Sequence, residues 1–165
     1  MYRMPKKFDI AEKRFVVVKK HEVCLLEDGS HKKATFTYSR WAYFVEQFEE
    51  IDSALSKVIK KEPDVKLAIH LGGAWYVSVT SGVFCVDIRK FYMTPDGAIK
   101  PTREGFAIRV REWNRIKQLA DVMKTANTTL AEAQPCWMQP DHYNQEGSMN
   151  CIECSPFGSW FTVAK

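Results

Sequence analysis

The chain has 165 residues, 45% of them hydrophobic and 13% aromatic, which excludes extensive disorder and fits one ordinary domain or two small units. The net charge of +4 is concentrated in residues 1–33 and 65–123, each with nine basic and five acidic residues. This distribution fits a polyanion that lies on a sheet and fits equally a solvated surface that varies in sign. No apolar run approaches the roughly eighteen residues that cross a bilayer, and the N-terminal stretch lacks the apolar core of a signal peptide, so we expect an intracellular protein without a membrane partner.

The first 64 residues predict strands followed by a helix. Residues 14–19, 22–26 and 32–38 have the composition of β-strands, with a polar turn before the last of them. Ser39 is suited to cap a helix. Apolar residues then recur at three- and four-residue spacing from Trp41 to Val58, so we expect one amphipathic helix that ends at about Lys60.

Residues 65–130 predict a longer set of strands and a second helix. Strands are expected at residues 66–71, 75–80, 83–93, 98–100 and 105–109, with a β-turn at residues 94–97. Within residues 83–93, alternation places Phe84, Val86 and Ile88 on one face and Arg89 on the other. The helix is expected from about Val110, with an apolar face that reaches Leu130.

The two halves repeat one phrase, FDIAEKRFVVV at residues 8–18 and IHLGGAWYVSV at residues 69–79. The offset is 61 residues here but 72 between Trp41 and Trp113, which head the two helices, so the first half is eleven residues shorter. Residues 23–25 track residues 84–86, which places the whole loss between those strands and the helix. Repetition at this period predicts two units, at residues 1–64 and 65–130, followed by a tail at residues 131–165.

The second half resembles the positive cofactor four family of single-stranded-DNA-binding transcriptional coactivators. The resemblance rests on YVSV from Tyr76, on VDIRKFYMTPDGAIKPTREG from Val86 to Gly105 and on Trp113 eight residues later, and it covers about residues 69–123. The first half resembles the family less fully, through FDIAEKRFVVV and the tryptophan-led helix. The family implies four antiparallel strands and one helix, with dimerisation through the helices and two curved sheets that face nucleic acid.

We therefore expect an α+β fold of two ββββα-type units that form an intramolecular pseudo-dimer, so that the chain is a monomer in solution. One four-stranded sheet with one helix buries its apolar faces poorly, whereas two paired helices cover them. The predicted helix-pairing core consists of Trp41, Phe44, Phe48, Ile51, Trp113, Ile116 and Met123.

The resemblance implies nucleic-acid contacts only where this chain matches the family. These positions are Arg89, Tyr92 (tyrosine in place of tryptophan), Lys100 and Arg103, whereas Glu104 stands where the family usually has a lysine. Arg89 and Tyr92 share a face only if a bulge intervenes, because a regular strand alternates. Basic residues of the first half complete the predicted binding set: Arg14, Lys19, Lys20, Lys32 and Lys33.

Another departure from the family is the hairpin at residues 80–83, which is short and lacks an aromatic residue between basic ones. Single-strand binding requires cations along the phosphates and rings on which bases stack. Sheet packing is the alternative role for Trp75, Phe91 and Tyr92, and core packing is preferred for Trp41 and Trp113.

Two functions follow as hypotheses. The first is a single-stranded-DNA-binding protein, with RNA or melted duplex as other ligands, that acts as a transcription coactivator or in replication or repair, in the nucleus or at a site of viral transcription. The alternative is an adaptor that contacts transcription proteins and binds nucleic acid weakly. We expect no enzyme, because the sequence has no HExxH, no phosphate-binding glycine loop and no Ser/His/Asp pattern.

The tail from residue 131 differs in composition from the rest of the chain. Cys136, His142, Cys151 and Cys154 are candidate zinc ligands, because thiolates and imidazoles suit a tetrahedral zinc ion. Their irregular spacing, and the scattered and odd number of cysteines, favour free thiols in a loosely docked or partner-binding tail. Apart from this zinc candidate, no cofactor is expected.

Overall fold

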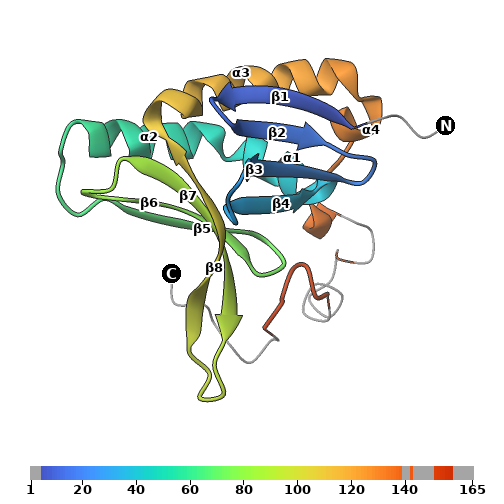
Figure 1. The fold of residues 1–165 in the computed structure, drawn as a ribbon. Coiled ribbons are helices and arrows are strands. Elements are labelled where there is room, and N and C mark those ends of the chain that lie inside the picture. The colour runs from blue at the N-terminus through green and yellow to red at the C-terminus, as the bar shows by residue number, and fades with distance from the viewer. Residues whose placement is uncertain (1–4, 139–141, 143–150, 158–165) are drawn as a thin grey trace.

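The computed structural model describes residues 5–138, 142 and 151–157 (Figure 1). The first half contains β1 (Lys6–Ala11), β2 (Arg14–Val18), β3 (Glu22–Glu27), β4 (Lys33–Thr37), α1 (Tyr38–Glu46) and α2 (Phe48–Ile59). The second half contains β5 (Lys66–Gly72), β6 (Trp75–Thr80), β7 (Cys85–Met93), β8 (Ile99–Arg109), α3 (Val110–Ala126) and α4 (Thr128–Ala131). A short 3-10 helix, η1 (Cys136–Met138), begins the tail, of which only part is described.

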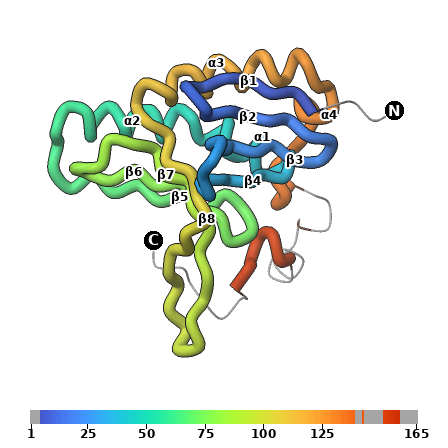
Figure 2. The backbone as a smooth tube through the Cα atoms, viewed as in Figure 1, coloured from blue at the N-terminus to red at the C-terminus, as the bar shows by residue number. Residues whose placement is uncertain are grey.

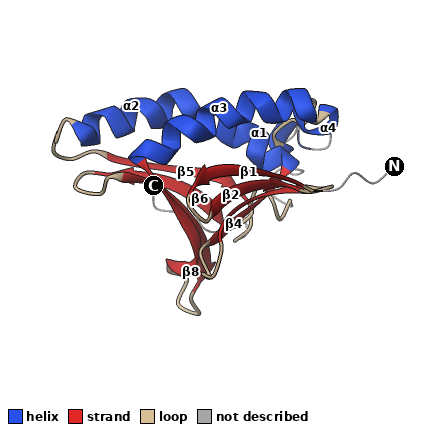
Figure 3. Cartoon of the chain, turned by 45° about the horizontal axis from the view of Figure 1, so that its top comes forward, coloured by secondary structure: helices blue, strands red, loops and turns tan. Residues whose placement is uncertain are grey.

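The α+β prediction is confirmed, because the strands form two four-stranded antiparallel sheets, β1-β2-β3-β4 and β5-β6-β7-β8. The helices form one layer above both sheets, and the β7–β8 hairpin projects on the opposite side (Figure 3). None of the described helices is long and apolar enough to cross a membrane.

Each half places a helix against the sheet of the other half. Helix α2 lies on β5, β6 and β7, whereas α3 contacts β1 as well as its own β7 and β8. Strand β4 lies beside β8, so the two sheets also meet directly. The inner faces of both sheets and the helices therefore share one hydrophobic core.

Aromatic contacts join the two sets of helices within that core. The ring of Trp113 lies 5.0 Å from that of Phe48 and 6.1 Å from that of Phe44, measured between centroids. Trp113 Nε1 also donates a hydrogen bond of 2.9 Å to Asp52 on α2. All seven predicted core residues are buried except Phe48, which is partly buried against the cluster.

The sheets have matching registers. The first strand pair of each sheet, β1–β2 and β5–β6, carries a register irregularity at an equivalent place. It lies between Asp9 and Ala11 in the first sheet and between His70 and Gly72 in the second, positions that differ by the 61 residues of the sequence repeat. Val16 pairs with Leu25, however, and its counterpart Val77 pairs with Ile88, an offset of 63. The prediction that residues 23–25 track residues 84–86 was therefore wrong by two residues, because the β2–β3 turn is itself two residues shorter.

Both predicted helices are interrupted. The first breaks at Gln47 between α1 and α2, and the second ends at Ala126, so that Leu130 belongs to the separate α4. The side chain of Thr37, and not that of Ser39, caps α1 by accepting from the Arg40 backbone N–H at 3.1 Å. Leu130 is nevertheless buried as the apolar periodicity predicts.

Candidate nucleic-acid interface

The projecting β7–β8 hairpin brings a predicted aromatic residue and a predicted cation side by side. Tyr92 on β7 is the direct cross-strand partner of Lys100 on β8. Tyr92 is 46% exposed and Lys100 is also exposed. The turn at the tip closes as predicted, with the Gly97 N–H donating to the Thr94 carbonyl at 2.9 Å. This arm can present a ring and an ammonium group to one nucleotide.

A register irregularity lies at the base of the arm. Arg89 pairs with Gly105 but Phe91 pairs with Pro101, so residues 102–104 of β8 lie opposite Lys90 alone. The extra residues are in β8, and β7 keeps its alternation. The bulge therefore exists, but Arg89 shares a face with Phe91 and not with Tyr92. Arg103 is exposed within this irregular stretch.

The guanidinium of Arg89 already has protein partners. It donates to both carboxylate oxygens of Asp87, at 3.0 and 3.1 Å, and to the Thr102 carbonyl at 3.1 Å. The hydrogen bonds to Asp87 raise the pKa of Arg89. A Cβ on Gly105 would lie 2.8 Å from Arg89 Cζ, so glycine is needed for the guanidinium to cross β8 at this point. In this conformation Arg89 therefore links β7 to β8 at the base of the arm.

Aromatic rings continue from the arm across the outer face of the second sheet. Phe91 contacts Tyr76 edge to face and Tyr76 contacts His70, both with ring centroids 4.9 Å apart. Burial raises the pKa of Tyr76 to about 12. Burial also lowers the pKa of His70. Trp75 is buried in the core, so its packing role is the one observed.

The comparison with known families falls on this same region. Residues 77–119 match the family described as Transcriptional Coactivator p15 (PC4). A PC4 domain is therefore found here, and it covers β6 from Val77 onward, the β7–β8 arm and the first part of α3. The PC4 family consists of transcriptional coactivators that bind single-stranded DNA, and it is not a family of enzymes. No solved structure matches the chain.

The PC4 domain exposes a second aromatic side chain that the sequence analysis missed. Phe84 was expected to share a face with Val86 and Ile88, but β7 begins only at Cys85 and Phe84 is 51% exposed, next to Val83 at 49%. The alternation holds from Val86 onward, where Val86 and Ile88 are fully buried. Phe84 therefore adds an exposed ring just beyond the hairpin at residues 80–83, although no basic residues flank it as they flank the aromatic residue of the family.

Outside the PC4 domain, the predicted lysines of the first half lie at two separate places. Lys19 and Lys20 are in the β2–β3 turn, whereas Lys32 and Lys33 are at the other end of β3, about 17 Å away along the strand. Lys19 pairs with Glu22 at 3.4 Å and Lys32 approaches Glu27 at 3.9 Å. The structure therefore does not gather these four lysines into one patch.

The assignment of Arg14 to the binding set is contradicted by its burial. Its side chain is 2% exposed, and its Nε donates to the equally buried Glu112 at 2.7 Å. Its Nη2 donates to the Ala107 carbonyl at 2.6 Å, and the guanidinium lies 4.0 Å from the centroid of the Phe106 ring. Arg14 cannot contact a phosphate, because it is the internal tie between β2 and the PC4 domain.

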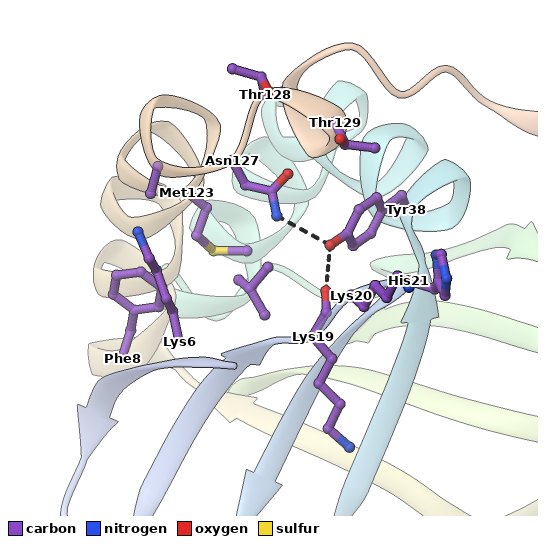
Figure 4. Close-up of a pocket in the computed structure, with 12 residues that line it drawn as sticks. Lys6, Phe8, Lys19, Lys20, His21, Tyr38, Met123, Asn127, Thr128 and Thr129 are labelled. Carbon is purple, nitrogen blue, oxygen red and sulfur yellow. Dashed lines mark hydrogen bonds between the residues drawn. The ribbon is translucent and has the colours of Figure 1, made fainter. Parts of the chain in front are cut away.

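A cavity of about 360 Å³ lies where the β2–β3 turn meets the junction of α3 and α4 (Figure 4). Lys19 and Lys20 contribute to its wall together with Lys6. The Tyr38 hydroxyl donates to the Lys19 carbonyl and accepts from Asn127 Nδ2 at 3.2 Å. Figure 4 shows that the Lys19 side chain extends away from Tyr38. The hollow therefore has a basic rim that belongs to the first half and a polar wall that belongs to the second.

The four candidate zinc ligands, which are spread irregularly over residues 136–154, come together in the structure. The ligand atoms of Cys136, His142, Cys151 and Cys154 all lie within 4.8 Å of one another, and each residue is half-buried. None of the cysteines among the described residues forms a disulfide.

Proposed function

We propose that this chain is a single-stranded-DNA-binding protein of the transcription machinery, and that the β7–β8 arm of its PC4 domain is the principal contact. The observation that carries the proposal is that the family match spans this arm, where Tyr92 and Lys100 are exposed cross-strand partners. Neither Lys100 nor Arg103 has an ion-pair partner within the described part of the chain. Their charges are thus available to phosphates.

Residues 1–64 and 65–130 are, in this proposal, two copies of one unit paired as an intramolecular pseudo-dimer. The support is the common strand order, the equivalent irregularities of β1 and β5, and the reciprocal placement of α2 and α3 on the opposite sheets. Light scattering is then expected to give the mass of one chain, and the mass of two chains would contradict the pseudo-dimer.

The mechanism combines stacking with charge neutralisation. A base stacked on Tyr92 contributes about 1–3 kcal/mol, and Lys100 and Arg103 neutralise the phosphates that flank it. Phe84 lies on the order of 25 Å from Tyr92 along β7, so it would stack on a different nucleotide. Lys19 and Lys20 at the rim of the Figure 4 cavity offer a further phosphate contact from the first half.

A protein-interaction adaptor is the second candidate, and specific ion pairs favour it. Asp87 neutralises Arg89, and Glu104 lies 3.9 Å from Lys90. Two cations of the PC4 domain therefore form ion pairs within the protein, which weakens their attraction for phosphates. An adaptor with this fold would bind transcription proteins while holding nucleic acid weakly. Either function places the protein at sites of transcription, in the nucleus or in a virus-infected cell.

Fluorescence anisotropy with labelled single- and double-stranded oligonucleotides over a salt series separates the two functions. The proposal expects tighter binding of single strands, a loss of roughly 5- to 150-fold for Tyr92→Ala, and a salt slope smaller by about 0.7 for Lys100→Ala. Lys124→Ala on the exposed side of α3 is the matched control, because it removes the same charge from the helix layer. Absence of binding at low salt refutes DNA binding and leaves the adaptor. Equal weakening by the Lys124 and Lys100 variants refutes the location of the site.

A further inference from the structure

We infer that Cys136, His142, Cys151 and Cys154 bind a structural zinc ion, and that this ion fixes the tail onto the turn between β5 and β6. Cys136 comes from η1, whereas Cys151 and Cys154 flank a turn fifteen and more residues later. The inference is independent of DNA binding, because these residues lie outside residues 77–119 that match the PC4 family.

The distances within the cluster are those of the edges of a zinc tetrahedron. With Zn–S bonds of about 2.3 Å and Zn–N bonds of about 2.0 Å, a tetrahedral ion holds two sulfurs about 3.8 Å apart and a sulfur and a nitrogen about 3.5 Å apart. Cys136 Sγ lies 3.7 Å from Cys151 Sγ and 3.8 Å from His142 Nδ1, and Cys154 Sγ lies 3.4 Å from the same nitrogen. A disulfide would bring two sulfurs to about 2.05 Å, so these separations are not those of a bonded pair.

The donor set selects the metal and its role. Three thiolates and one imidazole are soft and borderline ligands, which favour zinc over magnesium or calcium. Four protein ligands leave no open position for a substrate, so the site is structural and not catalytic. His142 Nδ1 also lies 2.7 Å from the Cys136 carbonyl, to which a protonated Nδ1 donates. Zinc would replace this proton, as metals do at histidine ligands.

The turn between the last two ligands is anchored to the body of the protein. The Gly73 N–H donates to the Glu153 carbonyl at 2.7 Å, and Arg40 Nη1 donates to both Glu153 carboxylate oxygens at 3.1 and 3.2 Å. The Ser155 N–H donates to the Cys151 carbonyl at 2.8 Å and closes the turn. In Figure 2 residues 151–157 accordingly lie against the loop that joins β5 and β6.

The β5–β6 turn is built to receive this segment. Gly72 and Gly73 both have positive φ, of 135° and 56°. A Cβ on Gly72 would lie 2.5 Å from Glu153 Oε1, and one on Gly73 would lie 2.8 Å from Arg40 Nη1. Two adjacent glycines thus make room for the Arg40–Glu153 ion pair. A tail that contacted the surface only weakly would not require two residues without side chains at this turn. Zinc holds the Cys151–Cys154 turn in the shape that presents Glu153 to Arg40.

Metal analysis of the purified full chain tests the site directly. We expect about one zinc per chain by mass spectrometry, and a loss of at least about tenfold in Cys151→Ser/Cys154→Ser. The matched control is Cys24→Ser/Cys85→Ser, which removes two thiols remote from the cluster and should leave the zinc content unchanged. Replacement of zinc by cobalt should give the visible absorption of a tetrahedral thiolate site, and this absorption should be lost in His142→Ala.

Three results would overturn the inference. The first is that the chain, refolded with equimolar zinc, retains less than about a tenth of an equivalent of zinc. The second is a disulfide among the three tail cysteines in the native protein, and the third is an equal loss of zinc in the Cys24→Ser/Cys85→Ser control.

Hydrogen exchange tests the docking. The Gly73 amide should exchange at least about tenfold faster in Cys151→Ser/Cys154→Ser, and an unchanged rate would refute the link between zinc and docking.

Discussion

The buried ion pair between Arg14 and Glu112 should be the strongest single tie between the two halves. Both side chains are at most 2% exposed, and Glu112 also accepts from the Arg109 backbone N–H at 2.9 Å, which caps α3. Glu112→Ala removes the closer carboxylate of the buried Arg14 guanidinium, which keeps the longer contact to Glu27 at 3.3 Å, at a cost of about 3–5 kcal/mol at most. It also removes the cap of α3, at a further cost of about 0.5–2 kcal/mol. We expect the free energy of unfolding to fall by about 3.5–7 kcal/mol, a large part of the roughly 5–15 kcal/mol of a typical domain.

Urea unfolding followed by tryptophan fluorescence and circular dichroism measures this loss, and the midpoint should fall by about 2 M. Arg14→Met/Glu112→Gln removes both charges while glutamine still caps α3, so it should recover to within about 2 kcal/mol of the natural chain. Lys19→Ala, which breaks the half-exposed pair with Glu22, should cost less than about 1 kcal/mol. The reasoning fails if Glu112→Ala costs no more than Lys19→Ala, or if the double variant is as unstable as the single one.

Two further variants test a pH effect and a close backbone approach. The hydrogen bond from Lys117 holds the pKa of Asp52 below its usual range, so the stabilisation is present above about pH 4 and is lost as the pH falls through the folded pKa. The difference in unfolding free energy between the natural chain and Asp52→Asn should therefore be under about 1 kcal/mol at pH 7 and shrink by pH 3, whereas a constant difference would contradict the assignment. Gly72→Ala should destabilise the chain by about 1–3 kcal/mol in urea unfolding because its Cβ meets Glu153. Gly82→Ala has a similar backbone strain but open space around its Cβ, so an equal loss in both would show that the contact is irrelevant.

Periodicity predicted the core well because it depends only on which residues must avoid water. The apolar positions from Trp41 to Val58 and from Trp113 to Leu130 are buried or, as at Phe48, partly buried against the core even where the helices break, since a short interruption moves the backbone without reversing the buried face. The break at Gln47 and the cap at Thr37 depend on local hydrogen bonds that spacing does not encode. Phe84 was misplaced for a related reason, because alternation says nothing of where a strand begins.

Charged residues of the site were less predictable, since a sequence shows a charge but not its partner. Arg14 has the same local signature as an exposed strand arginine, and its partner Glu112 is 98 residues away. Arg89 matches the family position, but Asp87 two residues earlier neutralises it. The tail cluster shows the same limit, because its spacing is irregular and only the fold brings Cys136 within 3.7 Å of Cys151.

The proposed tandem arrangement explains why the described part of the tail docks at the β5–β6 turn. Arg40 and Glu112 are equivalent at the 72-residue offset, and each lies in the first turn of a helix that begins beside the other half. Glu112 reaches Arg14 at the start of β2, whereas Arg40 lies at the turn before β6 and pairs with Glu153. Two identical chains would have to make the same contact twice. A single chain can place opposite charges at the two equivalent positions, and the arginine, together with the glycine turn beside it, creates a site that the Glu153 carboxylate fills.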